Sequence, residues 1–432
     1  MSSRRVIVVV VFLVVWGLAT HGTYAGSGDE PHYLIIAQSL AFDGDLDVAN
    51  NYAQPGNLIG AGELQPEAHA RPGRDGVLRP VHDIGLPLLF APYVRVVYPL
   101  ADIVARSLPT WVLEKTRLNA SLIFRHFISL AMAVLTGLLG TQLFSLFLRV
   151  ATTERQAMGW ALLLTLSPPL LSHSFLFFTE IPSALLVASI FKVLSEPSNQ
   201  AGPSALHPDG PKGTAPRGLR GPALVGGAIG LLLLIHVRNI ALVAVFFAWA
   251  IARLYRAQAA RASWGAFGFG VASLLLVRTA VVYRFWGTLL TTPIARPDLS
   301  MNVLDAAREI GSRAIGLLVS RDFGLLPFAP VFALAIPGLW VLRTKPTCAP
   351  HAIWALAAAY LTTLLLPYTN PWGVSGGFAP AARMIVPIVP LLALALFVTA
   401  QAIPKTSRVL IATQLLINAY VWQFPKVMWG GQ

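Results

Sequence analysis

Long apolar stretches follow one another along most of the chain, separated by shorter polar segments. An α-helix needs about 20 apolar residues to cross the hydrocarbon core of a bilayer, and most stretches approach that length. They predict about 11 spanning helices and therefore an all-α integral membrane protein, a polytopic helical bundle that forms a single transmembrane domain over residues 1–432. The predicted spans cover residues 6–24, 121–148, 156–174, 178–195, 222–237, 240–255, 264–284, 325–342, 351–367, 384–401 and 407–424.

The first apolar stretch has a second interpretation. It follows Arg4 and Arg5, and a signal peptide also begins with a basic segment, so cleavage near Ala25 is the alternative. The many later spans favour an uncleaved first helix.

The polar segments between the predicted spans differ in length and composition. Residues 25–120 predict a large first extracytoplasmic loop, which carries a semi-apolar segment over 84–100 that we expect at the membrane interface. Residues 196–221, rich in Pro, Gly and Ser, predict a flexible cytoplasmic linker. Residues 285–324 predict a second extracytoplasmic loop with a short helix over 302–318.

Composition supports a membrane protein and excludes other classes. The chain is 55% hydrophobic and only 12% charged, with a mean hydropathy of +0.65, whereas a soluble domain is about one quarter charged. Its single cysteine, Cys348, excludes an internal disulfide framework and a cysteine-based zinc site. The net charge of +13 is scattered over the ends of the predicted helices, so we expect no nucleic-acid partner.

The basic residues also predict an orientation. With the N-terminus in the cytoplasm, most arginines and lysines near the spans fall on the cytoplasmic side, as the positive-inside rule requires. The exceptions are Arg238 and Arg383, which this topology places on the other side. The residues that follow the rule are Arg4, Arg5, Arg149, Arg155, Lys212, Arg217, Arg220, Arg253, Arg256, Arg261, Arg343, Lys345, Lys405 and Arg408.

An acidic pair, Asp29 and Glu30, comes directly after the first span. Its ordinary interpretation is a helix start, with Asp29 as N-cap and Pro31 in the first turn of an amphipathic helix over 31–42 that lies on the membrane. Its functional interpretation is a general base, because a carboxylate at the membrane surface can take the proton of an acceptor hydroxyl. Three further acids, at 43, 45 and 47, lack the spacing of an EF-hand and favour turns over a metal site.

Several isolated charges lie where charge is costly. Arg383 opens a predicted span after a glycine-rich segment, and it either reaches lipid headgroups or grips a phosphate with its planar guanidinium. We expect Arg238 and His82 to bind the same phosphate. Three more residues are candidates for a second acid or for acceptor binding, although each also has an ordinary capping, loop or packing interpretation: Glu180, Asp83 and Arg125.

Several segments resemble the GT-C superfamily of membrane glycosyltransferases. The acidic pair at the end of the first helix, in GDEPHYLIIAQSL, is the feature closest to that superfamily, and the branch it resembles most contains the protein O-mannosyltransferases and the lipid A aminoarabinose transferase. The other similar segments are HDIGLPLLFAPY, SHSFLFFTEIPSALL, RDFGLLPFAPVFALAIPGLW and NPWGVSGGFAPAARMIVPIVPLL.

The resemblance implies a glycosyltransferase that moves a sugar from a polyprenyl phosphate to a glycan, lipid or protein acceptor on the extracytoplasmic face, with inversion. It assigns the general base to Asp29, with Glu30 beside it, and a donor-phosphate ligand to Arg383. It implies a bacterial-type inner membrane and no cofactor; a divalent metal is the less favoured option. The main alternative is a transporter or flippase of lipid-linked sugars, and a non-catalytic membrane scaffold is a further one. We find neither the internal repeat nor the mid-span charges that many transporters have.

Overall fold

A computed structural model gives the fold. It describes residues 2–20, 28–54, 57–59, 64–66, 68–196, 220–289, 292–293, 300–367, 375–377, 379–424 and 427. In this part of the chain the regular structure is helical apart from one small sheet, a hairpin in the first loop.

The first half of the chain contains the first helix, the large loop and the four helices that follow it. The elements in order are α1 (Ser3–Thr20), α2 (Glu30–Gln38), a π-helical turn (Ser39–Asp43), α3 (Ala49–Ala53), β1 (Ala70–Pro72), β2 (Leu78–Pro80), α4 (Gly85–Ser107), α5 (Thr110–Thr116), α6 (Ala120–Phe147), α7 (Glu154–Thr165), α8 (Leu170–His173) and α9 (Glu180–Ser195).

The second half is also built of helices. The elements in order are α10 (Arg220–Ile235), η4 (Val237–Asn239), α11 (Ile240–Arg256), α12 (Arg261–Trp286), α13 (Val303–Val319), η5 (Pro330–Leu334), α14 (Ala335–Val341), η6 (Leu342–Thr344), η7 (Pro346–Cys348), α15 (Pro350–Leu365), η8 (Arg383–Ile388), α16 (Val389–Ala402) and α17 (Pro404–Gln423).

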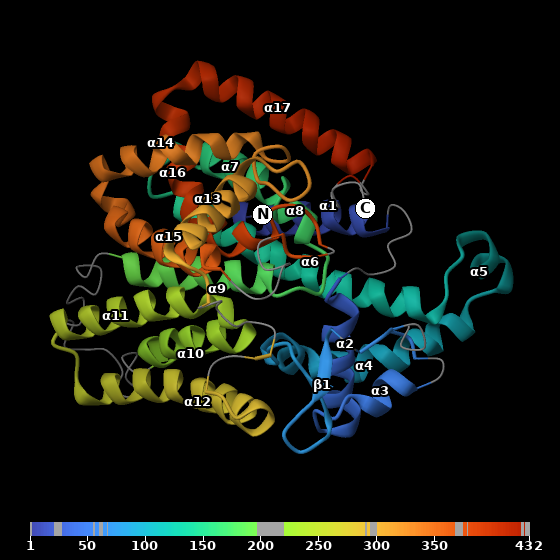
Figure 1. Cartoon of the computed structure of the whole chain (residues 1–432). Coiled ribbons are helices and arrows are strands. Elements are labelled where there is room, and N and C mark those ends of the chain that lie inside the picture. Colours follow the sequence, from blue (N-terminus) through green and yellow to red (C-terminus); the bar gives the residue numbers. More distant parts are fainter. Residues whose placement is uncertain are drawn as a thin grey trace, which may run out of the picture.

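The helices pack around α6, which crosses the middle of the molecule (Figure 1). Helices α1, α4, α7 and α9 contact it, α10 packs along α12, and α14 packs along α16. Helix α16 is deeply enclosed, because 11 of its 14 residues are buried. The loop elements α2, α3 and β1 gather beside α4, away from the C-terminal helices (Figure 1).

Five helices among the described residues are long and apolar enough to cross a membrane. They span Gly85–Ser107, Ala120–Phe147, Val237–Arg256, Arg261–Trp286 and Arg383–Ala402. Large apolar side chains face outward on several helices, as at Leu224, Phe269, Leu276 and Leu416, each more than half exposed. A bilayer would cover such a surface. The number of about 11 spans and the orientation stay predictions.

One prediction about the first loop is wrong. Helix α2 does not lie on the membrane as an amphipathic helix, because all its residues, Glu30–Gln38, are buried in the protein. It packs against α4 because Leu34, Ile35 and Ile36 give it more than one apolar face. The segment 84–100, expected at the membrane interface, lies in α4, whose length and composition also suit a membrane span, so its position relative to the membrane stays a prediction.

Other loop predictions have different outcomes. The helix expected over 302–318 is confirmed as α13, whose N-cap Asn302 accepts a hydrogen bond from the backbone N–H of Asp305. Most of the expected linker, residues 197–219, lies outside the described residues, as does part of the glycine-rich segment before Arg383, namely residues 370–374 and 378.

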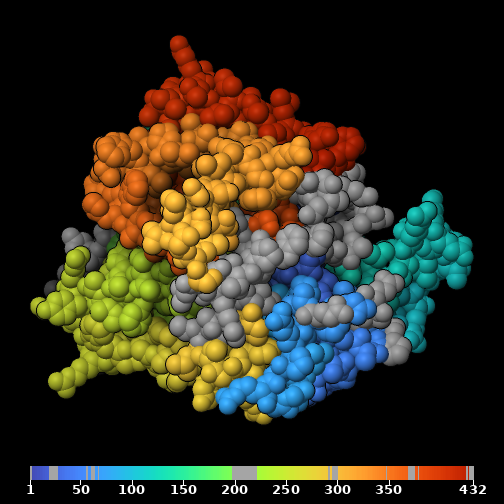
Figure 2. Space-filling model, viewed as in Figure 1, coloured from blue at the N-terminus to red at the C-terminus, as the bar shows by residue number. Residues whose placement is uncertain are grey.

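The β1–β2 hairpin lies against the end of α12. Ala70 pairs with Pro80 and Pro72 with Leu78 in an antiparallel ladder. The backbone N–H of Arg74, in the turn, donates to the carbonyl of Phe285 at 2.9 Å. The space-filling view shows the hairpin and α12 next to each other at the base of the molecule (Figure 2). This contact fixes the two residues that flank the hairpin, His69 and His82.

Candidate active site

Four charged residues from distant parts of the chain meet where helices begin. Asp29 is the N-cap of α2, Glu180 is the first residue of α9, Arg383 is the first residue of η8, and Arg238 lies in the short turn η4. Helix N-termini carry partial positive charge, which stabilises the two carboxylates at these positions. The two arginines then supply full positive charges opposite them.

Arg383 joins the two acids. Its Nη2 lies 2.7 Å from Oδ2 of Asp29, and its Nε donates to Oε1 of Glu180 at 2.8 Å. The second arginine, Arg238, donates through Nη2 to the same Glu180 oxygen at 2.9 Å. The result is a continuous chain of carboxylates and guanidiniums, Asp29–Arg383–Glu180–Arg238, which we call the charge chain.

The backbone around Arg383 is shaped to hold its side chain. Gly376 has a φ of +84° and its carbonyl accepts from Nη1 of Arg383 at 2.9 Å. A Cβ atom at Gly376 would lie 3.0 Å from Cδ of Arg383. Glycine at this position therefore leaves room for the Arg383 side chain and also permits the positive φ of the turn. On its other side, the guanidinium lies 4.3 Å from the ring centroid of Phe178.

The two ends of the charge chain differ in exposure. The side chain of Glu180 is 0% exposed and that of Arg383 is 4% exposed, whereas the side chain of Asp29 is 25% exposed. At the Arg238 end, Nη1 contacts the sulfur of Met384, and Nε makes no hydrogen bond to any described residue. A buried N–H without a partner is costly, which makes Nε of Arg238 a candidate donor to a ligand.

Asp29 is held in its ionised form. Burial by itself raises the pKa of Asp29, but the positive charge of Arg383, to which its hydrogen bond adds, holds the pKa well below its usual range. In this arrangement Asp29 is therefore a weak base. It becomes a stronger base only if Arg383 is engaged by another anion.

Three histidines lie beside Asp29. His69 and His82 flank the hairpin, and Nδ1 of His69 lies 2.9 Å from Nε2 of His82. Nδ1 of His69 also lies 3.8 Å from Oδ1 of Asp29. The ring of His32 stacks on that of His69 with 3.5 Å between centroids. Burial lowers the pKa of His82 to about 4 and that of His32 to about 3, and it lowers the pKa of His69, so these imidazoles are uncharged at neutral pH.

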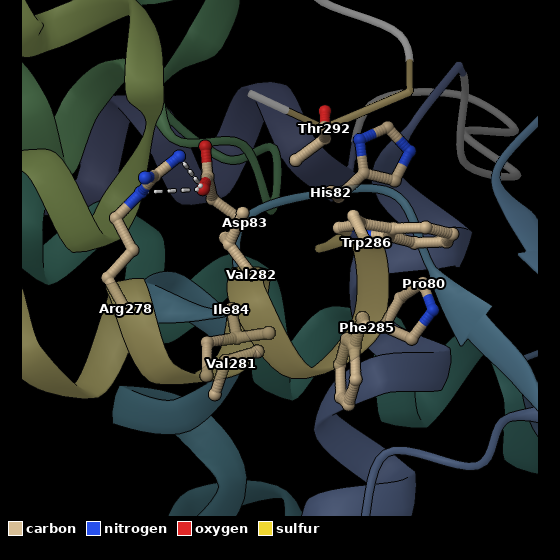
Figure 3. A pocket seen from close by; sticks show the side chains of 10 residues that line it. All are labelled: Pro80, His82, Asp83, Ile84, Arg278, Val281, Val282, Phe285, Trp286 and Thr292. Carbon is tan, nitrogen blue, oxygen red and sulfur yellow. Dashed lines mark hydrogen bonds and ion pairs between the residues drawn. The ribbon is translucent and has the colours of Figure 1, made fainter. Parts of the chain in front are cut away.

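A second ion pair lies behind His82. Asp83 accepts from Nε of Arg278 at 3.0 Å and from the backbone N–H of Val237 at 2.6 Å, and burial is the main cause that raises its pKa. Asp83 and Arg278 line a small cavity together with His82 and Trp286 (Figure 3). The contact to Val237 ties the first loop to the turn that carries Arg238.

Gly85 makes that contact possible. A Cβ atom at Gly85 would lie 2.5 Å from the backbone of Leu234 at the end of α10. Only glycine lets the start of α4 approach the end of α10 this closely. Asp83 then reaches the N–H of Val237, which follows α10.

The remaining predicted site residues lie outside the charge chain. Oε1 of Glu30 accepts from the backbone N–H of Phe177 at 2.9 Å, a contact that fixes the segment before α9. Arg125 donates to the carbonyl of Ile59 at 3.3 Å. The structure thus brings together Asp29, Arg383, Glu180 and Arg238, with His82 next to them, and gives Glu30 and Arg125 structural contacts. The roles of all these residues in binding or catalysis stay predictions.

Sequence reasoning missed His69, His32 and Arg278. His69 had a detectable signal, because Asp75-Gly76 is a hairpin turn sequence between Ala70–Pro72 and Leu78–Pro80. Pairing those strands would have placed His69 opposite the residues after β2. Arg278 lies within an apolar run and had only its charge as a signal.

Comparison with known proteins gives a distant structural likeness. Neither a scan against protein-family models nor a search of curated proteins finds a match. Among solved structures, the chain is similar to the oligosaccharyltransferase of Archaeoglobus fulgidus in complex with zinc and sulfate, at 16% identity and a TM-score of 0.45 over 98% of this chain and 52% of that one. The same enzyme tethered with an acceptor peptide gives 15% identity and a TM-score of 0.43, over 98% and 54%.

The chain therefore spans about half the length of the oligosaccharyltransferase that it resembles. A TM-score of this size carries no conclusion about activity. The narrower resemblance to protein O-mannosyltransferases and the aminoarabinose transferase stays a prediction, because the structural likeness is to a different enzyme.

Proposed function

We propose that this chain is a membrane glycosyltransferase that moves a sugar from a polyprenyl phosphate to an acceptor hydroxyl at the charge chain. The observation that carries the proposal is the ion pair between Arg383 and Asp29, at 2.7 Å. It puts a group suited to a phosphate leaving group directly beside a group suited to an acceptor proton.

The arginines supply the phosphate site. As the bond between the sugar and the phosphate breaks, negative charge grows on the phosphate oxygens, and preorganised cationic donors stabilise it. Arg383 and Arg238 lie on either side of Glu180, and Nε of Arg238 has no partner among the described residues. Because Asp29 is the most exposed member of the chain, a phosphate displaces it from Arg383 more easily than it displaces the buried Glu180.

That displacement would activate Asp29. With Arg383 engaged by phosphate, its lowering effect on the pKa of Asp29 is lost, and burial then raises the pKa. Asp29 would become an effective base only when the donor is bound. The acceptor oxygen forms a bond to the anomeric carbon, the bond from that carbon to the phosphate oxygen breaks, and the hydroxyl proton passes to Asp29. Attack from the side opposite the phosphate inverts the anomeric carbon.

Glu180 has a different role in this proposal. It is completely buried and contacts both arginines through one oxygen, so it holds them in place and keeps the site near neutrality before the donor arrives. We therefore assign Glu180 as a positioning residue, not as the base.

A transfer assay tests the proposal. Purified protein in proteoliposomes is given a panel of polyprenyl-phosphate sugars with radiolabelled sugar and a panel of hydroxyl acceptors. Asp29→Asn is compared with wild type and with Asp102→Asn, a matched change of an exposed acid that pairs with Arg106 in α4. We expect transfer to fall by roughly 10²–10⁴-fold in Asp29→Asn and to be unchanged in the control.

Two outcomes would count against the proposal. Equal transfer by wild type and Asp29→Asn would remove Asp29 as the base. Movement of the labelled lipid across the bilayer, without transfer from any donor, would instead establish a flippase.

A further inference from the structure

We propose that Asp29, His69 and His82 form a binding site for a divalent transition-metal ion, with Zn²⁺ as the ion that fits best. From the sequence, a divalent metal is the less favoured option, and His69 is not among the candidate residues. The hairpin brings His69 next to His82: the backbone N–H of Val81 donates to the carbonyl of His69 at 3.1 Å, so the residues at the two ends of the hairpin are neighbours. The proposal does not depend on glycosyl transfer, because binding is measured without turnover.

The three ligand atoms are close enough to share an ion. One oxygen of Asp29 and one ring nitrogen each of His69 and His82 all lie within 4.8 Å of one another. Two of these separations are 2.9 Å, between the imidazole nitrogens, and 3.8 Å, between Asp29 and His69. A point at equal distance from the three atoms lies within about 2.4 Å of each, so shifts of a few tenths of an ångström reach the zinc bond length of about 2.0–2.1 Å.

The donor set selects the class of ion. Two imidazoles and one carboxylate suit zinc and its neighbours in the first transition row, whereas calcium and magnesium prefer oxygen ligands only. Three protein ligands leave a fourth position free, which is the pattern of catalytic zinc sites and not of structural ones.

The surrounding residues hold the ligands in place. The ring of His32 stacks on His69, and Nδ1 of His32 lies 2.6 Å from the hydroxyl of Tyr52. Arg383 binds Oδ2 of Asp29, which leaves Oδ1 directed to His69. Contacts of this kind fix the orientation of metal ligands, and their removal typically weakens metal binding by about 10–100-fold.

The simpler interpretation is a set of packed histidines joined by one hydrogen bond. It explains the 2.9 Å contact between His69 and His82. It does not explain the arrangement of the Asp29 carboxylate. One oxygen of Asp29, Oδ1, lies toward the imidazole rings, while Arg383 binds the other oxygen, Oδ2. A metal ion would use all three groups.

Metal binding to the purified full-length chain tests the proposal. The protein, carrying an affinity tag without histidine, is stripped with a chelator, dialysed against Zn²⁺, and its bound zinc is counted by mass spectrometry. Co²⁺ is then substituted, because four-coordinate Co²⁺ absorbs visible light far more strongly than the hydrated ion. His69→Ala, His82→Ala and the conservative Asp29→Asn are compared with His351→Ala, an exposed histidine at the start of α15.

We expect one zinc ion per chain in wild type and in His351→Ala, with the spectrum of four-coordinate Co²⁺. Each ligand variant should bind at least about tenfold more weakly, including Asp29→Asn, which changes shape least. Zinc should also raise the unfolding temperature of wild type but not of the ligand variants, and the apo-state unfolding temperatures show whether a variant has folded. Wild type without stoichiometric zinc, or binding that survives loss of both His69 and His82, would overturn the proposal.

Discussion

Replacement of Arg383 by lysine separates charge from geometry at the proposed phosphate site. Arg383 makes three directed contacts, to Asp29 at 2.7 Å, to Glu180 at 2.8 Å and to the carbonyl of Gly376 at 2.9 Å. A lysine keeps the positive charge but has one ammonium group in place of the planar fork, so it cannot make all three contacts in the same directions.

The expected loss follows from those contacts. A hydrogen bond to a charged group contributes about 1.5–3 kcal/mol, and Arg383→Lys loses at least one such bond in a buried site. A deficit of about 3 kcal/mol in the transition state corresponds to a roughly hundredfold slower transfer. If the arginine fork binds the phosphate, the loss should be seen in kcat as well as in KM for the donor, because the phosphate gains charge as the bond breaks.

The assay is the initial rate of sugar transfer at varied donor concentration, with the unfolding temperature measured in parallel. The control is Arg308→Lys on α13, where the arginine is mostly exposed and pairs with Asp305 at 3.5 Å. That variant should transfer at the wild-type rate. Transfer by Arg383→Lys at more than half the wild-type rate would refute the reasoning, since it would mean that positive charge alone suffices.

Three further predictions concern neighbouring groups. Glu180→Gln leaves both arginines with one carboxylate fewer, so we expect roughly tenfold tighter binding of free polyprenyl phosphate, measured by equilibrium binding, together with a lower unfolding temperature. Asp83→Asn leaves Arg278, which is 2% exposed, without its carboxylate, and should lower the free energy of unfolding by about 3–5 kcal/mol in denaturant titrations, whereas Asp102→Asn should change it by about 1 kcal/mol or less. His82 has a pKa of about 4 in the folded state and about 6.5 when unfolded, so the unfolded chain binds more protons between those values. The unfolding temperature of the metal-free protein should therefore fall as the pH drops from 6.5 towards 4, and less steeply in His82→Asn.

The helices were predictable because apolar length is a local property. The predicted spans over 121–148, 240–255 and 264–284 correspond closely to α6, α11 and α12. The environment of α2 was not predictable in the same way, because the sequence Glu30–Gln38 shows that apolar residues need cover but not whether lipid or protein supplies it. The packing of α2 against α4 decides that question.

The charge chain was predictable in its members but not in its pairs. The sequence indicates four candidate residues, because each carries a charge next to an apolar segment: Asp29, Glu180, Arg238 and Arg383. Their contacts join residues far apart in the sequence, and a single sequence contains no signal of that pairing. All four residues lie at helix starts, and these starts meet in the folded protein. This pattern could not have been used to predict the pairs, because many other helix starts carry no charge.

The most direct test of the proposed function is a cryo-electron microscopy structure with a polyprenyl-phosphonate sugar, a donor analogue whose sugar cannot leave. The proposal predicts the phosphonate bound to Arg383 in place of Asp29 and within contact of Arg238, Glu180 still bonded to both arginines, and the anomeric carbon facing Asp29. Density for the phosphonate elsewhere, with the contact of 2.7 Å between Arg383 and Asp29 intact, would contradict it.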